Sequence, residues 1–246
     1  TGISFRGIPN GHEFTSLLLA ILNADGQGKN FPDEAVAARI KALKGEIWLQ
    51  TYVSLTCTNC PDVVQALNVM ALINPDISHE MVDGGLYQDE IERLGIQGVP
   101  AVYVNGEPLH VGRGDLGVLL QELEDKVGTD HDGEAVLPVR TYDVLVLGGG
   151  PAGVSAAIYS ARKGLRVAVV AERIGGQVND TTGIENLVSV ARTTGTQLAA
   201  DFRTHLSDYP IDIFDNRQVV AANLKDGQKT VSVRGGETFA APAVVI

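Results

Sequence analysis

Two cysteines separated by two residues are the side chains of this sequence with the clearest capacity for chemistry. They form Cys57-Thr-Asn-Cys60-Pro61, directly after a strand-like run. Two thiols at this spacing at the start of a helix can close into a disulfide with little strain, and the unpaired N–H groups there favour negative charge. We therefore expect a lowered pKa for the Cys57 thiol, which would make it the attacking thiolate. Cys60 would be the shielded, resolving thiol, and Pro61 suits the first helical turn because no N–H is needed there.

Two other interpretations of the cysteine pair remain open, half of a zinc site and a chance pair of core cysteines. A zinc site needs two more ligands. The chain has no further cysteine and only five histidines, and neither His79 nor His110 has ligand-like spacing. We therefore predict no metal. The small number of cysteines also excludes a framework of structural disulfides.

A proline about 40 residues beyond the cysteines strengthens the redox interpretation. Val99-Pro100 stands just before a strand-like segment. Thioredoxin-like folds place a cis-proline opposite the dithiol, where it bars metal and presents backbone to a substrate strand. Pro100 alone would be interpreted as a strand-edge proline. The dithiol and the proline together predict a working redox pair.

A glycine loop in the second half of the chain predicts a nucleotide site. Gly148-Gly-Gly150-Pro151-Ala152-Gly153 follows an apolar strand and precedes a helix. In such a loop the first glycine permits the turn, the second lets the backbone approach a pyrophosphate, and the third allows close packing of helix on strand. The phosphates lie at the helix N-terminus. A glycine turn in an α/β domain that binds no ligand is the alternative.

An acidic residue after the second strand supports dinucleotide binding. Glu172 stands 24 residues after Gly148, where a carboxylate can accept hydrogen bonds from ribose hydroxyls. Pro151-Ala152 inside the loop and Gly175-Gly176-Gln177 after the acid go beyond the general fingerprint. These additional residues point to a flavoprotein.

The elements that must position the dithiol are those of a thioredoxin-like unit preceded by two helices that it does not need. From hydrophobic spacing and turn residues we expect helices at about 13–22, 33–44, 61–73, 87–94 and 115–127, strands at about 46–54, 78–82 and 99–104, and a hairpin at Asn105-Gly106.

The elements around the glycine loop form a Rossmann-like βαβ unit with further strands. The expected order is a strand at 142–147, a helix at 152–163, a strand at 166–170 ending at Glu172, a helix at 196–207, strands at 211–214 and 218–222, and a hairpin around Gly235-Gly236. The predicted fold class is therefore α/β, with a thioredoxin-like domain followed by a Rossmann-like FAD-binding domain that is incomplete.

Charge separates the two halves. Residues 1–128 carry 8 basic and 17 acidic side chains, residues 129–246 carry 11 and 13, and the formal net charge of the whole chain is −11. This acidity argues against nucleic acid or an anionic membrane as a partner. The polar stretch 129–140 is the expected linker between domains at 1–128 and 141–246.

The ends of the sequence complete these expectations. The chain has no initiator methionine and stops in the β-branched run Ala243-Val-Val-Ile246, so we expect a fragment. The apolar run Leu17–Leu22 is far shorter than the roughly 20 residues that span a bilayer. Because no signal-peptide pattern precedes it, we expect a cytoplasmic protein without a membrane partner.

The motifs together resemble the flavoprotein subunits of alkyl hydroperoxide reductases, a family that joins a thioredoxin-like domain to a thioredoxin-reductase-type FAD domain. The segments that carry the resemblance are Gly11-His-Glu-Phe-Thr-Ser16, Cys57 to Asn68, Gly98-Val-Pro-Ala-Val102, the glycine loop with Glu172, Gly175-Gly-Gln177, and Ile184-Glu-Asn186. They are distributed over essentially the whole chain.

The resemblance implies a relay in which NADH reduces FAD, FAD reduces a neighbouring dithiol, and that dithiol reduces Cys57 and Cys60. These then reduce the disulfide of a peroxiredoxin, which destroys hydrogen peroxide and alkyl hydroperoxides. The resemblance also implies a homodimer, a flavin contact from Thr181 and Asn186 with Gln177 beside it, and a carboxylate near the dithiol at Glu13, for which a buried capping acid is the alternative. The first 30 residues or so would be the tail of a preceding thioredoxin-like fold.

The sequence departs from the family in what it lacks. It has no second Cys-x-x-Cys, no second glycine fingerprint for the nicotinamide, and no closing FAD segment. A general thioredoxin-disulfide reductase and a non-catalytic thioredoxin-like adaptor are the alternative functions. The extra residues before the dithiol domain argue against the former.

Overall fold

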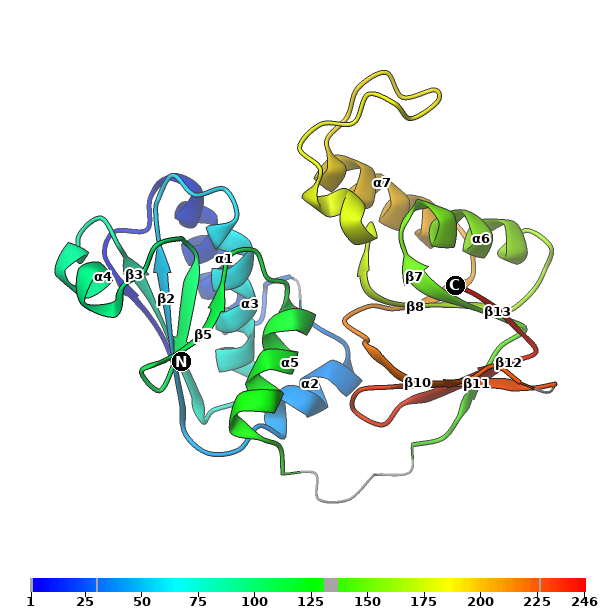
Figure 1. The fold of residues 1–246 in the computed structure, drawn as a ribbon, viewed down its shortest axis with the longest axis horizontal. Coiled ribbons are helices and arrows are strands. Elements are labelled where there is room, and N and C mark those ends of the chain that lie inside the picture. Colours follow the sequence, from blue (N-terminus) through cyan, green and yellow to red (C-terminus); the bar gives the residue numbers. More distant parts are fainter. Residues whose placement is uncertain (1, 30, 131–136, 226) are drawn as a thin grey trace. The chain divides into compact units, whose positions relative to one another are not determined.

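The computed structural model describes residues 2–29, 31–130, 137–225 and 227–246. The chain divides into two compact units, Thr1–Gly133 and Glu134–Ile246. Figure 1 shows the helices and strands of each unit and labels most of them. Each unit is described by itself below.

The first unit is built on a five-stranded sheet with the order β1-β3-β2-β4-β5. Its strands are β1 (Ile3–Arg6), β2 (Ile47–Val53), β3 (Ile77–Asp83), β4 (Ala101–Val104) and β5 (Glu107–Val111). The first three strands are parallel to one another, whereas β4 and β5 are antiparallel to their neighbours. The β4–β5 hairpin turns at Asn105-Gly106, as predicted, and both residues have positive φ.

Helices cover both faces of this sheet (Figure 1). They are α1 (Phe14–Ala24), preceded by the short 3-10 helix η1 (Gly11–Glu13), and α2 (Glu34–Lys41), α3 (Cys60–Ile73), α4 (Gln88–Leu94) and α5 (Leu116–Val127). The main core joins α2, α3 and α5 to one face of the sheet, with Leu67 and Leu120 fully buried in it. A smaller cluster packs α4 against Tyr52 and Tyr103 on the other face.

The opening segment departs from the sequence expectation. The sequence predicts no strand before the first helix, and it predicts that the thioredoxin-like unit does not need the helices that precede the dithiol. In the structure β1 pairs in parallel with β3, with Ile3 opposite His79, and α1 packs against α3. The unit therefore does use this segment, because β1 is one edge strand of the sheet.

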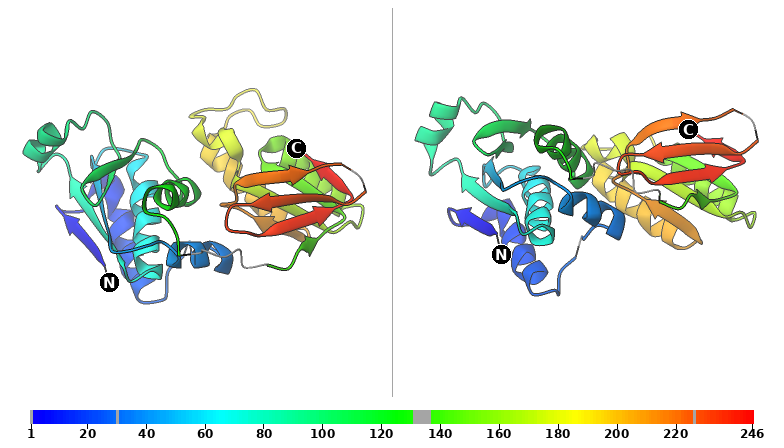
Figure 2. Two further views of the ribbon diagram at one scale, coloured as in Figure 1. Left: turned by 60° about the horizontal axis from the view of Figure 1, so that its bottom comes forward. Right: turned by 90° about the horizontal axis from the view of Figure 1, so that it is seen from below.

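The second unit contains two four-stranded sheets. The parallel sheet has the order β13-β7-β8-β9, formed by Ala243–Val245, Val144–Gly149, Val167–Ile174 and Ile211–Phe214. The other sheet has the order β10-β11-β12-β6, formed by Val219–Asn223, Lys229–Val233, Thr238–Ala241 and Arg140–Thr141. Figure 2 shows the two sheets of this unit from two further sides.

The helices of the second unit, α6 (Pro151–Ala161) and α7 (Gly195–Ser207), pack on one face of the parallel sheet through apolar side chains. The other face meets the second sheet around Phe214 and Phe239, whose ring centroids lie 4.8 Å apart. The β11–β12 hairpin turns at Gly235-Gly236, as predicted.

The predicted linker falls between these units. Its residues 131–136 lie outside the described residues. At its start, Thr129 forms a β-bridge with Leu43 in the first unit, and at its end Arg140 begins β6. In the described residues, no helix combines the length and the apolar character that a membrane crossing requires.

Candidate functional sites

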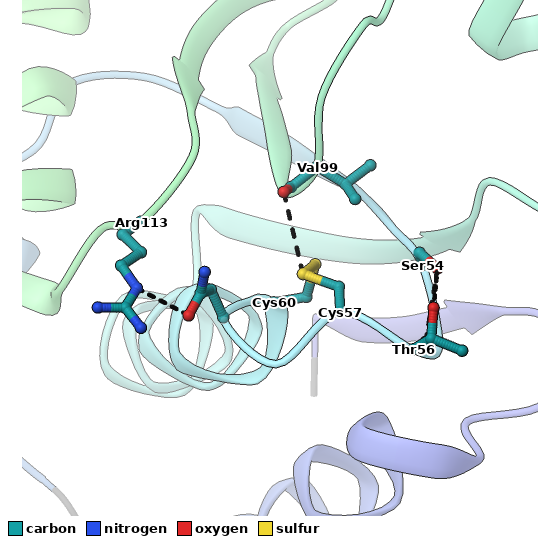
Figure 3. The surroundings of a disulfide bond; sticks show 7 residues. Ser54, Thr56, Cys57, Cys60, Val99 and Arg113 are labelled. Carbon is teal, nitrogen blue, oxygen red and sulfur yellow. Dashed lines mark hydrogen bonds between the residues drawn. A yellow bond between two sulfur atoms is a disulfide. The ribbon is translucent and has the colours of Figure 1, made fainter. Parts of the chain in front are cut away.

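Cys57 and Cys60 form a disulfide in this structure, with their Cα atoms 5.6 Å apart. They lie in the turn that leads from β2 into α3 (Figure 3). Cys60 is fully buried, whereas Cys57 is partly exposed. The more exposed Cys57 and the fully buried Cys60 fit an attacking and a resolving thiol, respectively.

The helix start lies at the disulfide itself. α3 begins at Cys60, one residue earlier than predicted, and Pro61 occupies its first turn. Because the first N–H groups of a helix have no partner within the helix, this end favours an anion. The sulfur of Cys57 lies just outside the first turn.

The peptide bond between Val99 and Pro100 is cis, as the sequence predicts for a thioredoxin-like fold. The carbonyl oxygen of Val99 lies 3.9 Å from Sγ of Cys57 (Figure 3). Pro100 is buried, and its carbonyl oxygen accepts a hydrogen bond of 2.9 Å from the N–H of Gly112. The structure thus brings backbone from the β4 end of the sheet against the exposed side of the disulfide.

The two histidines considered as zinc ligands make other contacts in this structure. His79 is buried, and its ring nitrogens lie 2.8 Å from the Thr51 hydroxyl and 2.7 Å from Oδ1 of Asn68. His110 contacts the carboxylate of Glu122 and a backbone carbonyl. No group of three or more potential metal-binding side chains occurs in the part of the chain that the structure describes.

Glu13 is buried in η1, near the start of α3. Burial is the main cause that raises the pKa of Glu13, the Ser16 hydroxyl opposes this rise, and the Asp62 carboxylate adds to it. The Ser16 hydroxyl itself accepts a hydrogen bond from Gln65. Within the described residues neither carboxylate oxygen of Glu13 has a hydrogen-bond partner, so the side chain does not act as a helix cap.

The glycine loop connects β7 to α6 in the second unit. α6 begins at Pro151, one residue earlier than predicted. Gly148 has φ +118°, a conformation that side chains other than glycine rarely adopt. A Cβ on Gly153 would lie 2.1 Å from the carbonyl oxygen of Gly148, whereas a Cβ on Gly150 would meet no described atom within 4 Å. Gly153 is therefore needed for packing, and Gly150 borders open space.

A cavity of about 390 Å³ opens at this loop. Five of the predicted cofactor residues line it, namely Gly148, Gly150, Glu172, Gly176 and Gln177. Glu172 lies inside β8, which runs on to Ile174 rather than ending at the acid. Glycine backbone, a helix start and an exposed carboxylate are the groups that hold the phosphates and ribose of a dinucleotide. These residues therefore fit the nucleotide part of FAD.

The other predicted cofactor residues do not line the cavity. Pro151, Ala152 and Gly153 belong to the first turn of α6, and Gly175 holds the loop closed by donating its N–H to the carbonyl oxygen of Gly149 at 2.8 Å. Thr181 and Asn186 are exposed on a segment between the 3-10 helix η2 (Gly176–Asp180) and α7. Of the predicted residues beyond Glu172, only Gly176 and Gln177 line the cavity.

Two arginines near these sites were not identified in the sequence. Nε of Arg113 donates a hydrogen bond of 2.7 Å to Oδ1 of Asn59 in the dithiol turn. Arg217 lines the cavity, is buried, and donates through Nε to Oε2 of Glu237 at 2.8 Å. The sequence did not point to these arginines, because each contacts a partner that is distant in sequence.

Comparison with known protein families identifies both units. Residues 49–123 match the thioredoxin domain family, and residues 142–246 match the pyridine nucleotide-disulphide oxidoreductase family. The chain therefore joins a thioredoxin-like domain, which carries the disulfide, to a domain of the pyridine nucleotide-disulphide oxidoreductase family.

The relatives are consistent with this class. The F subunit of the alkyl hydroperoxide reductase of Staphylococcus aureus is 44% identical over 246 residues, which is 100% of this chain and 47% of that protein. A Bacillus subtilis protein named NADH dehydrogenase is 49% identical over 226 residues, 92% of this chain and 43% of that protein. The expected resemblance to the flavoprotein subunits of alkyl hydroperoxide reductases is confirmed. The chain spans about half the length of these relatives.

Two solved structures are similar to part of the chain. The N-terminal domain of alkyl hydroperoxide reductase AhpF from Enterococcus faecalis is 37% identical, with a TM-score of 0.47, covering 50% of this chain and 58% of that one. Thioredoxin reductase of T. acidophilum is 30% identical, with a TM-score of 0.40, covering 43% of this chain and 34% of that one.

Proposed function

We propose that this chain is part of a flavoprotein disulfide reductase that passes electrons from NADH through FAD to Cys57 and Cys60, and from there to the disulfide of a peroxiredoxin. The observation that carries the proposal is a disulfide with one accessible and one buried sulfur, opposite a cis-proline. The nucleotide cavity in the same chain supports a flavin as the source of electrons.

The exchange itself needs only the two sulfurs. With the pair reduced, the Cys57 thiolate attacks one sulfur of the partner disulfide and forms a mixed disulfide, and the other partner sulfur leaves as a thiolate that takes up a proton. The buried Cys60, deprotonated, then attacks Sγ of Cys57 and releases the second partner thiol. The partner gains two electrons and two protons, and Cys57 and Cys60 return to the disulfide seen here.

When bound, FAD would supply the two electrons that reduce this disulfide again, by way of the neighbouring dithiol that the family resemblance implies. Gly148 and Gly150 would hold its pyrophosphate against the start of α6, and Glu172 would accept hydrogen bonds from its ribose. The family resemblance further implies NADH as the electron source of the whole protein, and contacts of Thr181 and Asn186 with the bound flavin, with Gln177 beside it.

The setting of the protein follows from its cysteines and its relatives. Both cysteines serve redox chemistry and none is left for structural bridges, so the protein would act in the cytoplasm. It would form a homodimer, as the family resemblance implies.

The test uses the reduced chain and an oxidised peroxiredoxin from an alkyl hydroperoxide reductase system. Free thiols on the peroxiredoxin are counted after mixing. Cys57→Ser should abolish reduction, and Cys60→Ser should trap a mixed disulfide through Cys57 that is visible on a non-reducing gel. Undiminished reduction by Cys57→Ser would contradict the proposal.

Two alternatives give different results in the same assay. A non-catalytic adaptor would bind the peroxiredoxin equally well after both cysteines are replaced by serine, and its biological effect would be unchanged. A general thioredoxin-disulfide reductase would reduce an oxidised thioredoxin faster than the peroxiredoxin. The side-by-side rates with the two oxidised proteins separate it from the proposed function.

A further inference from the structure

Arg113 connects a distant loop to the dithiol turn. It lies in the loop between β5 and α5, and its Nε donates a 2.7 Å hydrogen bond to Oδ1 of Asn59, the residue directly before Cys60 (Figure 3). Asn59 occupies the cap position of α3, but its side chain makes no capping hydrogen bond to the helix. The side chain that could have capped α3 is thus engaged by Arg113 instead.

The surroundings of this contact are acidic. Asp62 lies in the first turn of α3, Asp115 caps α5, and Glu13 is buried in η1. The protein atoms around Asp62 raise the pKa of its carboxyl group, the charge of Arg113 lowers it, and the charge of Asp115 raises it. Carboxylates beside a thiol disfavour its thiolate, and a cation favours it. Arg113 therefore offsets the acidic side chains around the helix start.

The Arg113 loop is itself held in place. The carbonyl oxygen of Arg113 lies 2.9 Å from Nε2 of His110, and Nδ1 of His110 lies 3.1 Å from both carboxylate oxygens of Glu122 on α5. Because a carbonyl oxygen can only accept, Nε2 carries the hydrogen. The contact ties the Arg113 backbone to β5 and α5.

We propose that Arg113 is a positioning residue for the dithiol, which holds the Cys57–Cys60 turn through Asn59 and supplies the positive charge that favours the Cys57 thiolate. The inference rests on the proposed function only in taking Cys57 as the attacking thiol. A planar guanidinium suits this double task because it donates directionally while it stays charged at every relevant pH.

The test measures how the reactivity of Cys57 depends on pH. The full chain is reduced, alkylated with iodoacetamide at pH values from 5 to 10, and the Cys57 peptide is quantified by mass spectrometry. Arg113→Gln should shift the midpoint of the alkylation profile upward by about half a pH unit to one unit. Arg113→Lys, which keeps the charge, should restore most of the profile, and Asn59→Ala should shift it upward by a smaller amount.

The matched control is Arg93→Gln, which removes an exposed arginine of the same unit on α4. It should leave the midpoint unchanged. All variants keep His12, His110 and the nearby carboxylates, so a shift found with Arg113→Gln and not with Arg93→Gln is assigned to the loss of Arg113, acting directly or through Asp62. Circular dichroism confirms that each variant is folded.

An unchanged midpoint in folded Arg113→Gln would overturn the proposal, and so would an equal shift in Arg93→Gln. If Arg113→Gln does not fold, Asn59→Ala is the deciding variant. An unchanged midpoint of the alkylation profile in Asn59→Ala would also overturn the proposal, because that variant removes the same contact. Iodoacetamide needs neither flavin nor peroxiredoxin. A shifted midpoint in a chain that fails to reduce peroxiredoxin would therefore refute the proposed function and leave the role of Arg113 intact.

Discussion

Two turns of this protein are built alike and carry different chemistry. In the first unit β2 leads through Cys57 to α3, and in the second unit β7 leads through Gly150 to α6. Each helix has a proline in its first turn. Both turns lie at the anion-favouring start of a helix, which in the proposed function stabilises a thiolate in one case and binds phosphate in the other. The dithiol turn keeps side chains that react, whereas the glycine turn removes side chains so that a ligand can approach the backbone.

The cores behind the two turns also differ. Behind the dithiol turn, His79 of β3 is buried between the Thr51 hydroxyl and Oδ1 of Asn68. Because Oδ1 can only accept, Nδ1 carries the hydrogen and Nε2 accepts from Thr51, which is the neutral form of the ring. Behind the glycine turn, the cluster that joins α6 to β7 and β8 is apolar. The buried histidine therefore gives the first unit a source of pH dependence that the apolar cluster behind the glycine turn lacks.

The largest effect should come from Gly153→Ala in the glycine turn. The new Cβ would lie 2.1 Å from the carbonyl oxygen of Gly148, so backbone must move. We expect the free energy of unfolding of the second unit to fall by about 3 kcal/mol, the upper range for overpacking. Urea unfolding followed by far-UV circular dichroism measures this, while Trp48 fluorescence reports the first unit. An unaltered second transition would show that the turn relaxes easily.

Gly150→Ala tests whether the glycine turn binds a ligand, rather than whether it packs correctly. Gly150 has φ −72° and open space at its Cβ among the described atoms, so this variant should fold normally. It should weaken FAD binding about a hundredfold, or about 2.7 kcal/mol, because a methyl group would occupy the space of the pyrophosphate. Isothermal titration with FAD measures the affinity of this variant against that of the unaltered chain. If Gly150→Ala bound FAD as tightly as the unaltered chain, the pyrophosphate would not bind at this turn.

The buried histidine predicts a pH dependence confined to the first unit. Burial lowers the pKa of His79 to about 3, from an ordinary value of 6.5. The unfolded chain then binds a proton that the folded chain does not, so stability is complete above pH 6.5 and is lost as the pH falls toward 3. Between pH 7 and pH 5 this group should remove about 2 kcal/mol of unfolding free energy.

Urea unfolding of the first unit, followed by Trp48 fluorescence at both pH values, tests this expectation. His79→Gln should be less stable at pH 7 but should depend less on pH. Glu13, whose pKa is raised chiefly by burial, acts in the opposite direction, and it is present in both proteins. Parallel pH profiles for the two proteins would assign the dependence to other groups.

The smallest expected effect is a gain of stability from Glu13→Gln. Burial, more than the nearby Asp62, raises the pKa of Glu13 above its ordinary 4.5, so the folded state loses stability as the pH rises through the folded pKa. Glutamine has the same shape and no charge to bury, and it should add about 1 kcal/mol at pH 7, within the usual range for one stabilising substitution. The gain should vanish at pH 4, where Glu13 is protonated in both states. A loss of stability at pH 7 would show that the charged form is favoured.

The elements that the sequence predicted well are those defined by neighbouring residues. The hairpin turns at Asn105-Gly106 and Gly235-Gly236 follow from the positive φ that such residues tolerate. α3 and α6 follow from a proline after a strand-like run, and each begins within one residue of its predicted start. Strand β1 was missed because Ile3–Arg6 is short and its pairing partner, β3, lies more than 70 residues away.

The candidate sites divide in the same way. The pairing of Cys57 with Cys60 and the role of Gly153 in packing depend on residues a few positions apart, so spacing alone predicted them. Arg113 and Arg217 reach partners 54 and 20 residues away, and no local pattern marks them.

The sequence by itself determined which chemistry this protein carries, because thiols at a helix start and glycines between strand and helix have few other uses. Only the tertiary structure decided which sulfur can be reached, which charges surround it, and which predicted residues share a cavity. Exposure and electrostatics depend on segments that approach from distant parts of the chain, as η1 and the Arg113 loop do around α3. Packing of such segments is a property of the whole fold, and no local spacing of residues encodes it.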